Sequence, residues 1–139
     1  MKLINSFLVL LFFSNLLFSQ NEIAGKWLTE DKEAIVQITE AGGKFYGTIV
    51  WLKAPNDEHG TPFTDDENPD KTLRNKPLIG LQILKKFEFK DNEWIGGTIY
   101  DPSDGKTYSG KLWIEKNNTL RVRGYIAFLH ETETWTKAN

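Results

Sequence analysis

Short runs in which apolar and polar residues alternate recur along the chain, and turn sequences separate them. A period of two is typical of strands that bury one face in a core and expose the other to solvent. Clusters rich in Gly, Asn and Asp interrupt the runs, as at 41–44, 90–93 and 116–119. The pattern predicts eight strands, at about 23–30, 33–39, 44–53, 80–90, 93–101, 106–115, 119–128 and 131–137.

Most turns between these strands are too short for anything but antiparallel hairpins. The best helical candidate is a short turn within 68–76. An open meander of eight strands would leave two unpaired edges, and closing the sheet removes them. The sequence therefore predicts an all-β fold, a single closed antiparallel eight-stranded up-and-down barrel. A barrel of this size is filled by its own side chains or holds one small ligand.

Four of the strands carry the phrase Gly-x-Ile or Gly-x-Leu, beginning at Gly47, Gly97, Gly110 and Gly124. Residues two apart share a face of a strand, so each Gly lies on the apolar side. A Gly inside a strand marks a tight bend or the close approach of another group. These positions either let large side chains pack closely or leave room inside the barrel, and the sequence alone allows both.

The inward face supplies the candidate ligand-binding residues. They are Phe45, Ile49, Trp51, Ile95, Ile99, Tyr108, Leu112, Val122, Ile126 and Phe128. The longest irregular segment, at about 54–79, is long enough to cover the barrel mouth, and it turns from acidic to basic along its length. Within it, Arg74 is a candidate for binding an anionic head group, although charge balance against the acidic residues before it is the simpler explanation.

The first residues have the layout of a secretory signal: Lys2, then an apolar run, then the small residue Ser19. The run is shorter than the roughly 18–20 residues that span a bilayer. We therefore predict a signal peptide at 1–19, a single barrel domain at 20–139 that lacks a transmembrane segment once the signal is removed, and a periplasmic or secreted protein. An uncleaved membrane tether is the alternative.

Composition excludes several classes of function. The chain has a formal net charge of −2, which is not the profile of a nucleic-acid binder. It has no Cys and two His, so a transition-metal site is poorly supported. Asp66, Asn68 and Asp70 match the start of a calcium loop, but Lys71 and Pro77 stand where that loop needs Gly and Glu. No catalytic residue, cofactor or metal ligand is predicted.

Longer phrases carry a family resemblance. They include Gly25–Leu28, Tyr46–Trp51, Leu73–Gly80, Gly96–Pro102, Arg121–Tyr125 and Thr134–Thr136. Together they resemble the bacterial family of exported proteins known as domain of unknown function 2147, over essentially the whole chain after the signal. The opening Gly-x-Trp also resembles the first strand of lipocalin-like barrels. That likeness implies that Trp27 plugs the closed end beside a late basic residue, for which Arg121 and Arg123 are the candidates.

The leading functional hypothesis is an exported, non-catalytic barrel that binds a small apolar or amphipathic molecule. One alternative is an interaction module of the cell envelope that uses the outward aromatic residues Tyr46, Trp113 and Tyr125. Another is a hydrolase that uses the carboxylates of Asp65, Asp66 and Asp101, although turn chemistry explains such residues more simply.

Overall fold

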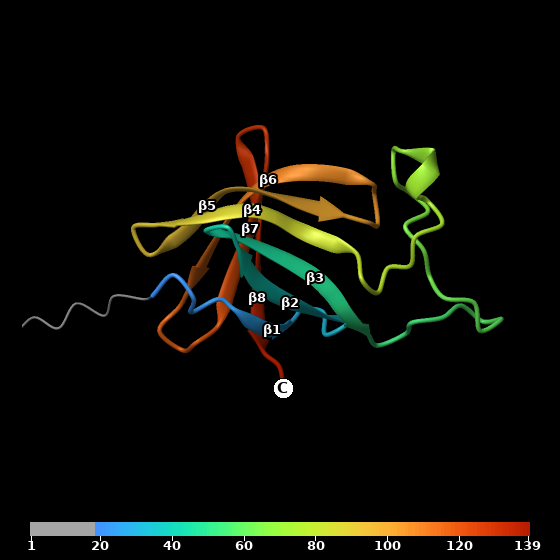
Figure 1. Ribbon diagram of the computed structural model, residues 1–139, viewed down its shortest axis with the longest axis horizontal. Coiled ribbons are helices and arrows are strands. Elements are labelled where there is room, and N and C mark those ends of the chain that lie inside the picture. Colours follow the sequence, from blue (N-terminus) through green and yellow to red (C-terminus); the bar gives the residue numbers. More distant parts are fainter. Residues whose placement is uncertain (1–18) are drawn as a thin grey trace, which may run out of the picture.

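The computed structural model describes residues 19–139, and these residues form the strands that the alternation predicts (Figure 1). The predicted signal peptide lies outside the described residues except for Ser19. One short 3₁₀ helix, η1 (Lys71–Leu73), falls within the predicted helical turn. The strands are β1 (Gly25–Leu28), β2 (Ala34–Ala41), β3 (Lys44–Leu52), β4 (Gln82–Lys90), β5 (Glu93–Asp101), β6 (Lys106–Ile114), β7 (Leu120–Ile126) and β8 (Leu129–Lys137).

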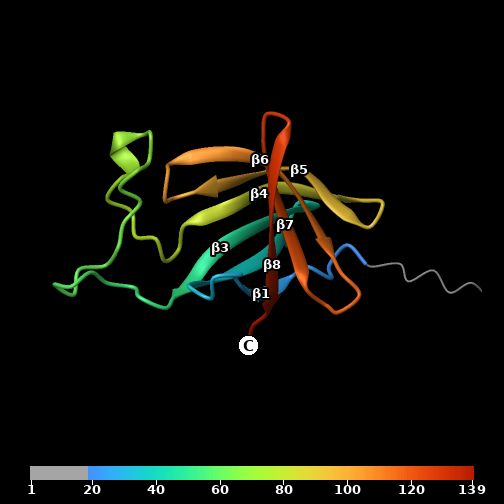
Figure 2. The same ribbon diagram turned by 180° about the vertical axis from the view of Figure 1, so that it is seen from behind.

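Each strand pairs antiparallel with the next, and β1 also pairs with β8, so the sheet closes on itself (Figure 2). The seam between β1 and β8 is short, with Trp27 opposite Lys137 and Leu28 opposite Thr136. Because the strands join in sequence order, every connection lies at one of two ends of the barrel. The prediction of a closed, eight-stranded up-and-down barrel is confirmed.

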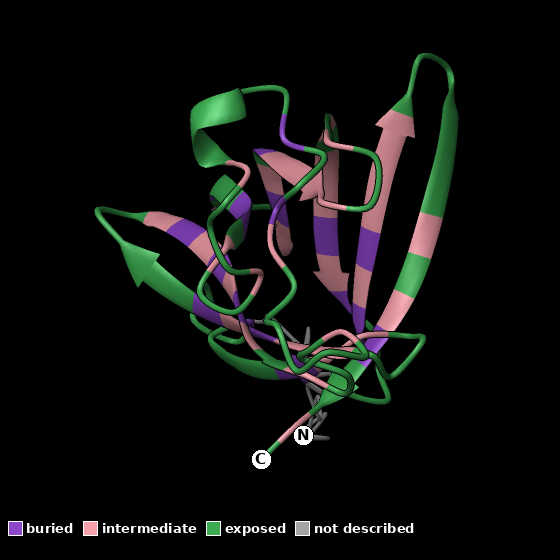
Figure 3. Ribbon diagram, turned by 90° about the vertical axis from the view of Figure 1, so that its right-hand side faces the viewer, coloured by how far each residue is buried: buried purple, intermediate pink, exposed green. Residues whose placement is uncertain are grey.

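Large apolar side chains fill one end of the barrel. Trp27, Phe45, Phe87 and Trp94 are almost completely buried there, and the ring centroids of Phe45 and Trp94 lie 6.3 Å apart in an edge-to-face arrangement. Residues 19–24 cover this end, since the Trp94 Nε1 donates a hydrogen bond of 3.0 Å to the carbonyl oxygen of Gln20. Buried residues recur at intervals along the strands, as a period of two requires (Figure 3).

Trp27 closes this end as the lipocalin likeness implies, but its cationic neighbour is neither Arg121 nor Arg123. The Nζ of Lys137 lies 5.3 Å from the Trp27 ring, because the seam places β8 beside β1. The two arginines lie instead over the ring of Trp113, at 6.0 and 4.9 Å. Both alternate with the inward Leu120 and Val122 on β7, and this alternation directs them to the outer face.

β-bulges change which side chains face inward. Between β5 and β6, Trp94 pairs with Leu112 and Gly97 with Gly110, so β5 carries one extra residue in this interval. Gly96 allows the bulge because its φ is +75°, a conformation that glycine adopts without steric cost. Trp94 therefore faces the interior. Ile95 pairs with the outward-facing Glu88 and lies on the outer face with it.

The glycines of the repeated phrase serve two purposes. A Cβ on Gly97 would lie 2.5 Å from both the Lys85 carbonyl oxygen and the Phe87 ring, so this glycine allows close packing. Gly47 and Gly110 are similarly crowded, with their nearest side-chain atoms at 2.8 and 2.6 Å. A Cβ on Gly124 would meet nothing nearer than 3.9 Å. Three glycines therefore admit neighbouring groups, and the fourth leaves open space.

Candidate functional site

The end of the barrel opposite Trp27 holds a cavity of about 500 Å³. This volume lies within the range of about 300–1,000 Å³ that is typical of small-molecule sites. The floor is apolar and comes from several strands: Val36, Ile49, Ile83, Ile99, Val122 and Trp135. Gly124 also lines the cavity, and its missing side chain contributes to the open volume.

The structure divides the ten predicted barrel residues into three groups. Five border the cavity: Ile49, Ile99, Tyr108, Val122 and Ile126. Phe45 and Leu112 are buried in the packed end, below the cavity. Trp51, Ile95 and Phe128 do not face the interior, because the backbone irregularities around them break the simple alternation.

The bulge at Gly96 accounts for Ile95, and the other two residues have local causes of their own. The register between β2 and β3 shifts where Val36 pairs with Ile49 but Ile35 pairs with Trp51, so Trp51 points outward and is 42% exposed. The β7–β8 hairpin turns at Ala127, which has a φ of +53°, two residues earlier than predicted. Phe128 consequently lies in the turn and is 92% exposed.

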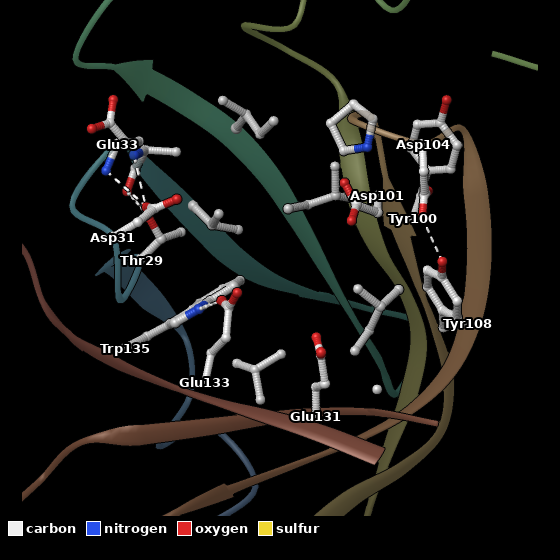
Figure 4. A pocket seen from close by; sticks show the side chains of 18 of the residues that line it. Thr29, Asp31, Glu33, Tyr100, Asp101, Asp104, Tyr108, Glu131, Glu133 and Trp135 are labelled. Atoms are coloured by element: carbon white, nitrogen blue, oxygen red, sulfur yellow. Dashed lines mark hydrogen bonds between the residues drawn. The ribbon is translucent and has the colours of Figure 1, made fainter. Parts of the chain in front are cut away.

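Six acidic side chains line the walls of the same cavity (Figure 4). They come from three parts of the chain that closure brings together: Asp31 and Glu33 between β1 and β2, Asp101 and Asp104 at the β5–β6 turn, and Glu131 and Glu133 on β8. Among the described residues, no Lys, Arg or His lines this cavity. Its upper part is therefore negatively charged above an apolar floor.

This acidic wall is not evident from the sequence pattern. Most of its members lie in or beside turns, where acidic residues are ordinarily explained by turn chemistry. Asp101 fits that explanation, because its Oδ1 accepts hydrogen bonds of 2.9 and 2.6 Å from the backbone N and Oγ of Ser103. One part of the wall could have been predicted from the sequence. On β8, Glu131 and Glu133 are spaced by two from the buried Trp135 and therefore lie on the same face of the strand.

The long connection between β3 and β4 (residues 53–81) is fixed to the barrel by a buried carboxylate. Asp65 is completely buried and accepts hydrogen bonds of 2.6 Å from the Tyr100 hydroxyl and 2.7 Å from the Asn68 Nδ2. Arg74 does not line the cavity, and its Nε donates a hydrogen bond of 2.7 Å to the Asn68 carbonyl oxygen. Asp65 and Arg74 thus hold the loop together, whereas Asp66 is exposed.

The acidic groups perturb one another and the nearby tyrosines. Burial is the main cause that raises the pKa of Glu133, and the charges of Asp31, Glu30 and Asp101 raise it further, although a hydrogen bond from the Trp135 Nε1 acts in the opposite direction. The hydrogen bond that Tyr108 donates to Asp104 is the main cause that raises its pKa to about 12. The same bond lowers the pKa of Asp104.

Replacing Glu133 with Gln is expected to stabilise the fold at neutral pH. Because its folded-state pKa is raised, the folded protein holds more protons than the unfolded chain between the ordinary Glu value of about 4.3 and the raised value. The free energy of unfolding therefore falls as the pH rises through this window. Gln cannot ionise, so it removes that loss, and its amide oxygen still accepts the hydrogen bond from the Trp135 Nε1. Chemical unfolding near pH 4 and near pH 7 should show a gain from Glu133→Gln only at the higher pH. An equal gain from Glu88→Gln, on the outer face, would contradict the assignment.

The outer-face aromatic residues lie apart from the cavity. Trp113 is surrounded by cations, since the Nζ of Lys111 is 5.2 Å from its ring and the two arginines of β7 lie over it as well. Tyr46 pairs with Thr39 across β2 and β3, and the ring of Tyr125 packs edge-to-face against His130.

Within residues 19–139, no three His, Asp or Glu side chains lie close enough together to hold a metal ion. In the same residues, no helix has the length and apolar character required to cross a membrane.

Comparison with known proteins agrees with this description. A search of curated proteins gave no match. Among solved structures, the chain is similar to protein HP1028 from the human pathogen Helicobacter pylori, which is described as belonging to the lipocalin family. The two are 23% identical over 84% of this chain and 83% of that chain, with a TM-score of 0.73, and this likeness shows a lipocalin-like fold. The model of a family described as "Uncharacterized protein conserved in bacteria (DUF2147)" matches residues 25–137, and the chain therefore belongs to that family.

Proposed function

We propose that this protein is an exported, non-catalytic binding protein that holds one small apolar or amphipathic molecule inside its barrel. The observation that carries the proposal is the cavity of about 500 Å³ with an apolar floor. Pockets for small molecules are mostly apolar and contain a few polar groups that orient the ligand. Export is supported by the signal-like pattern of the first residues in the sequence.

The packing around the cavity supports a role in binding rather than only in folding. The other end of the barrel is closed by Trp27 and its neighbours, which are almost completely buried. At the cavity end, a Cβ added to Gly124 would meet no atom closer than 3.9 Å, so the position is not crowded. A barrel under selection for stability alone would gain from filling this space, because apolar burial is favourable and voids are costly.

The test is binding of a neutral apolar probe, N-phenyl-1-naphthylamine, whose fluorescence rises in an apolar site. Titration into the wild-type protein should show saturable binding. Gly124→Leu should weaken that binding by at least about tenfold, because the new side chain occupies the cavity rather than the packed end. The variant should keep the circular dichroism spectrum of the wild type, since its Cβ meets no atom closer than 3.9 Å.

The matched control is Ser109→Leu, which adds a similar side chain at an exposed position of the neighbouring strand β6. It should leave probe binding unchanged. If the wild type and Gly124→Leu bind the probe equally, the probe lies outside the cavity. Either that result or the absence of binding to both proteins would overturn the proposed function.

A further inference from the structure

The charges of the cavity are not balanced within the protein. Of its six carboxylates, only Glu33 lies within ion-pair distance of a cation among the described residues, at 4.0 Å from the Nζ of Lys53, and both of these side chains are more than half exposed. An exposed pair of this kind contributes little. The Lys44–Glu88 and Lys111–Glu93 pairs lie on the outer face, and the His59–Glu58 pair lies in the loop between β3 and β4.

The hydrogen bonds that these carboxylates accept come from neutral donors. Asp31 accepts from the Thr29 hydroxyl at 2.7 Å and from the backbone N of Glu33 at 2.9 Å. Glu133 accepts from the Trp135 Nε1 at 2.7 Å. Such bonds hold the side chains in place but leave their negative charge uncompensated. Burial is the main cause that raises the pKa of Glu133, and the hydrogen bond to Asp104 is the main cause that raises the pKa of Tyr108; the charges of neighbouring carboxylates raise both pKa values further.

The arrangement does not suit a metal ion. Metal sites need several ligand oxygens that converge on one point, and no three acidic or His side chains among residues 19–139 are close enough to do so. Figure 4 shows the labelled carboxylates on different walls, with Asp31 and Glu33 on one side and Asp101 and Asp104 on another. Charge that is spread around an apolar floor fits a larger molecule with both a cationic and an apolar part.

We infer that the ligand of this cavity is an organic cation, an amine or quaternary ammonium group attached to an apolar body. The apolar body contacts the floor formed by residues such as Ile49 and Val122, and the cationic group lies among the carboxylates of the upper wall. The inference rests on the proposed function and adds the charge of the ligand to it. An anionic amphiphile of the same shape would be repelled by the carboxylates from three parts of the cavity wall.

The test compares three probes that share one alkyl chain: octylammonium, 1-octanol and octyl sulfate. Isothermal titration calorimetry near neutral pH and at low salt should rank them in that order of affinity. Octylammonium should bind at least about tenfold more tightly than octyl sulfate. Raising the salt from about 0.02 to about 0.5 M should weaken octylammonium binding and leave 1-octanol binding unchanged, since salt screens only the charged contact.

Two substitutions test which residues supply the charge. The double variant Glu131→Gln and Glu133→Gln should weaken octylammonium binding by about fivefold and leave 1-octanol binding unchanged. Gln at 133 still offers an oxygen to Trp135, which preserves the hydrogen bond there. Glu88→Gln, on the outer face, removes the same charge away from the cavity and should change neither value. If the double variant does not fold, Glu131→Gln alone is used, because it leaves the hydrogen bond between Glu133 and Trp135 unchanged.

The outcomes separate this inference from the proposed function. Binding of 1-octanol together with equal affinities for octylammonium and octyl sulfate would overturn the inference and leave the proposed function standing. An octylammonium affinity that does not respond to the loss of the β8 carboxylates or to salt would also overturn it. Failure of all three probes and of N-phenyl-1-naphthylamine would overturn both.

Discussion

Replacing Trp27 with alanine is expected to lower the free energy of unfolding by about 3–5 kcal/mol, the range for truncating a large buried aromatic side chain. Trp27 has no exposed surface. Its Nε1 donates a hydrogen bond of 2.9 Å to the Ile23 carbonyl oxygen, which is buried with it and would lose its donor. Its ring also contacts the cation of Lys137 beside the seam. Urea-induced unfolding, followed by circular dichroism, measures the loss.

The control for this prediction is Trp51→Ala. Trp51 belongs to the same residue type but points outward and is 42% exposed, so its truncation should cost about 1 kcal/mol or less. A loss at Trp51 as large as that at Trp27 would mean that the β2–β3 bulge does not direct this side chain to the outer face.

Gly97→Ala is expected to have an effect of similar size, about 3 kcal/mol, at the upper end of what overpacking costs. The added methyl group would lie 2.5 Å from the Lys85 carbonyl oxygen, and this atom belongs to the backbone of the neighbouring strand and cannot turn aside. The Phe87 ring, which is completely buried, is equally close. Either β4 and β5 must separate, or the ring must leave its place in the core.

Gly124→Ala provides the matched comparison, because Gly124, like Gly97, is the first residue of a Gly-x-Ile phrase and the substitution is the same. Its Cβ would meet only ordinary contacts at 3.9 and 4.0 Å. The substitution should therefore be neutral or stabilise the fold by up to about 1 kcal/mol, since alanine restricts the unfolded chain. Melting temperatures of the two variants test the pair, and equal destabilisation would contradict the distinction between crowded and open glycines.

The strand pattern was sufficient to predict the barrel. Eight strands that are apolar on one face and joined by short turns have few other ways to bury those faces and pair their edges. The pattern failed where one residue is inserted. Trp51 and Ile95 look inward from their spacing, yet a single extra residue beside each reverses the face. The doublet Gly96-Gly97 was the available sign of the second bulge, since the first glycine permits the bulge and the second admits the Phe87 ring.

The candidate site was harder to predict than the fold. Its apolar floor follows from alternation, and residues such as Ile49, Ile99 and Val122 were found in this way. The acidic wall depends on closure, which brings residues 31–33, 101–104 and 131–133 around one opening although they are far apart in sequence. Nothing local marks these residues as partners. The basic residues of the loop suggested Arg74 as a ligand-binding residue. Its guanidinium instead donates a hydrogen bond to a backbone carbonyl of the same loop.

The short seam between β1 and β8 has a consequence for when the cavity exists. Its walls include Thr29, which directly follows the first strand, and Trp135 on the last strand. Among the strand pairs of the barrel, β1 and β8 are the farthest apart in sequence, so their pairing costs the most chain entropy. Pairing of segments that are distant in sequence is also slow. A nascent chain that still lacks β8 also lacks one wall of the cavity, so the ligand of the proposed function could bind only after β8 has been synthesised and paired. Proteolytic removal of β8 would open the barrel and take away the part of the cavity wall that Glu131, Glu133 and Trp135 form.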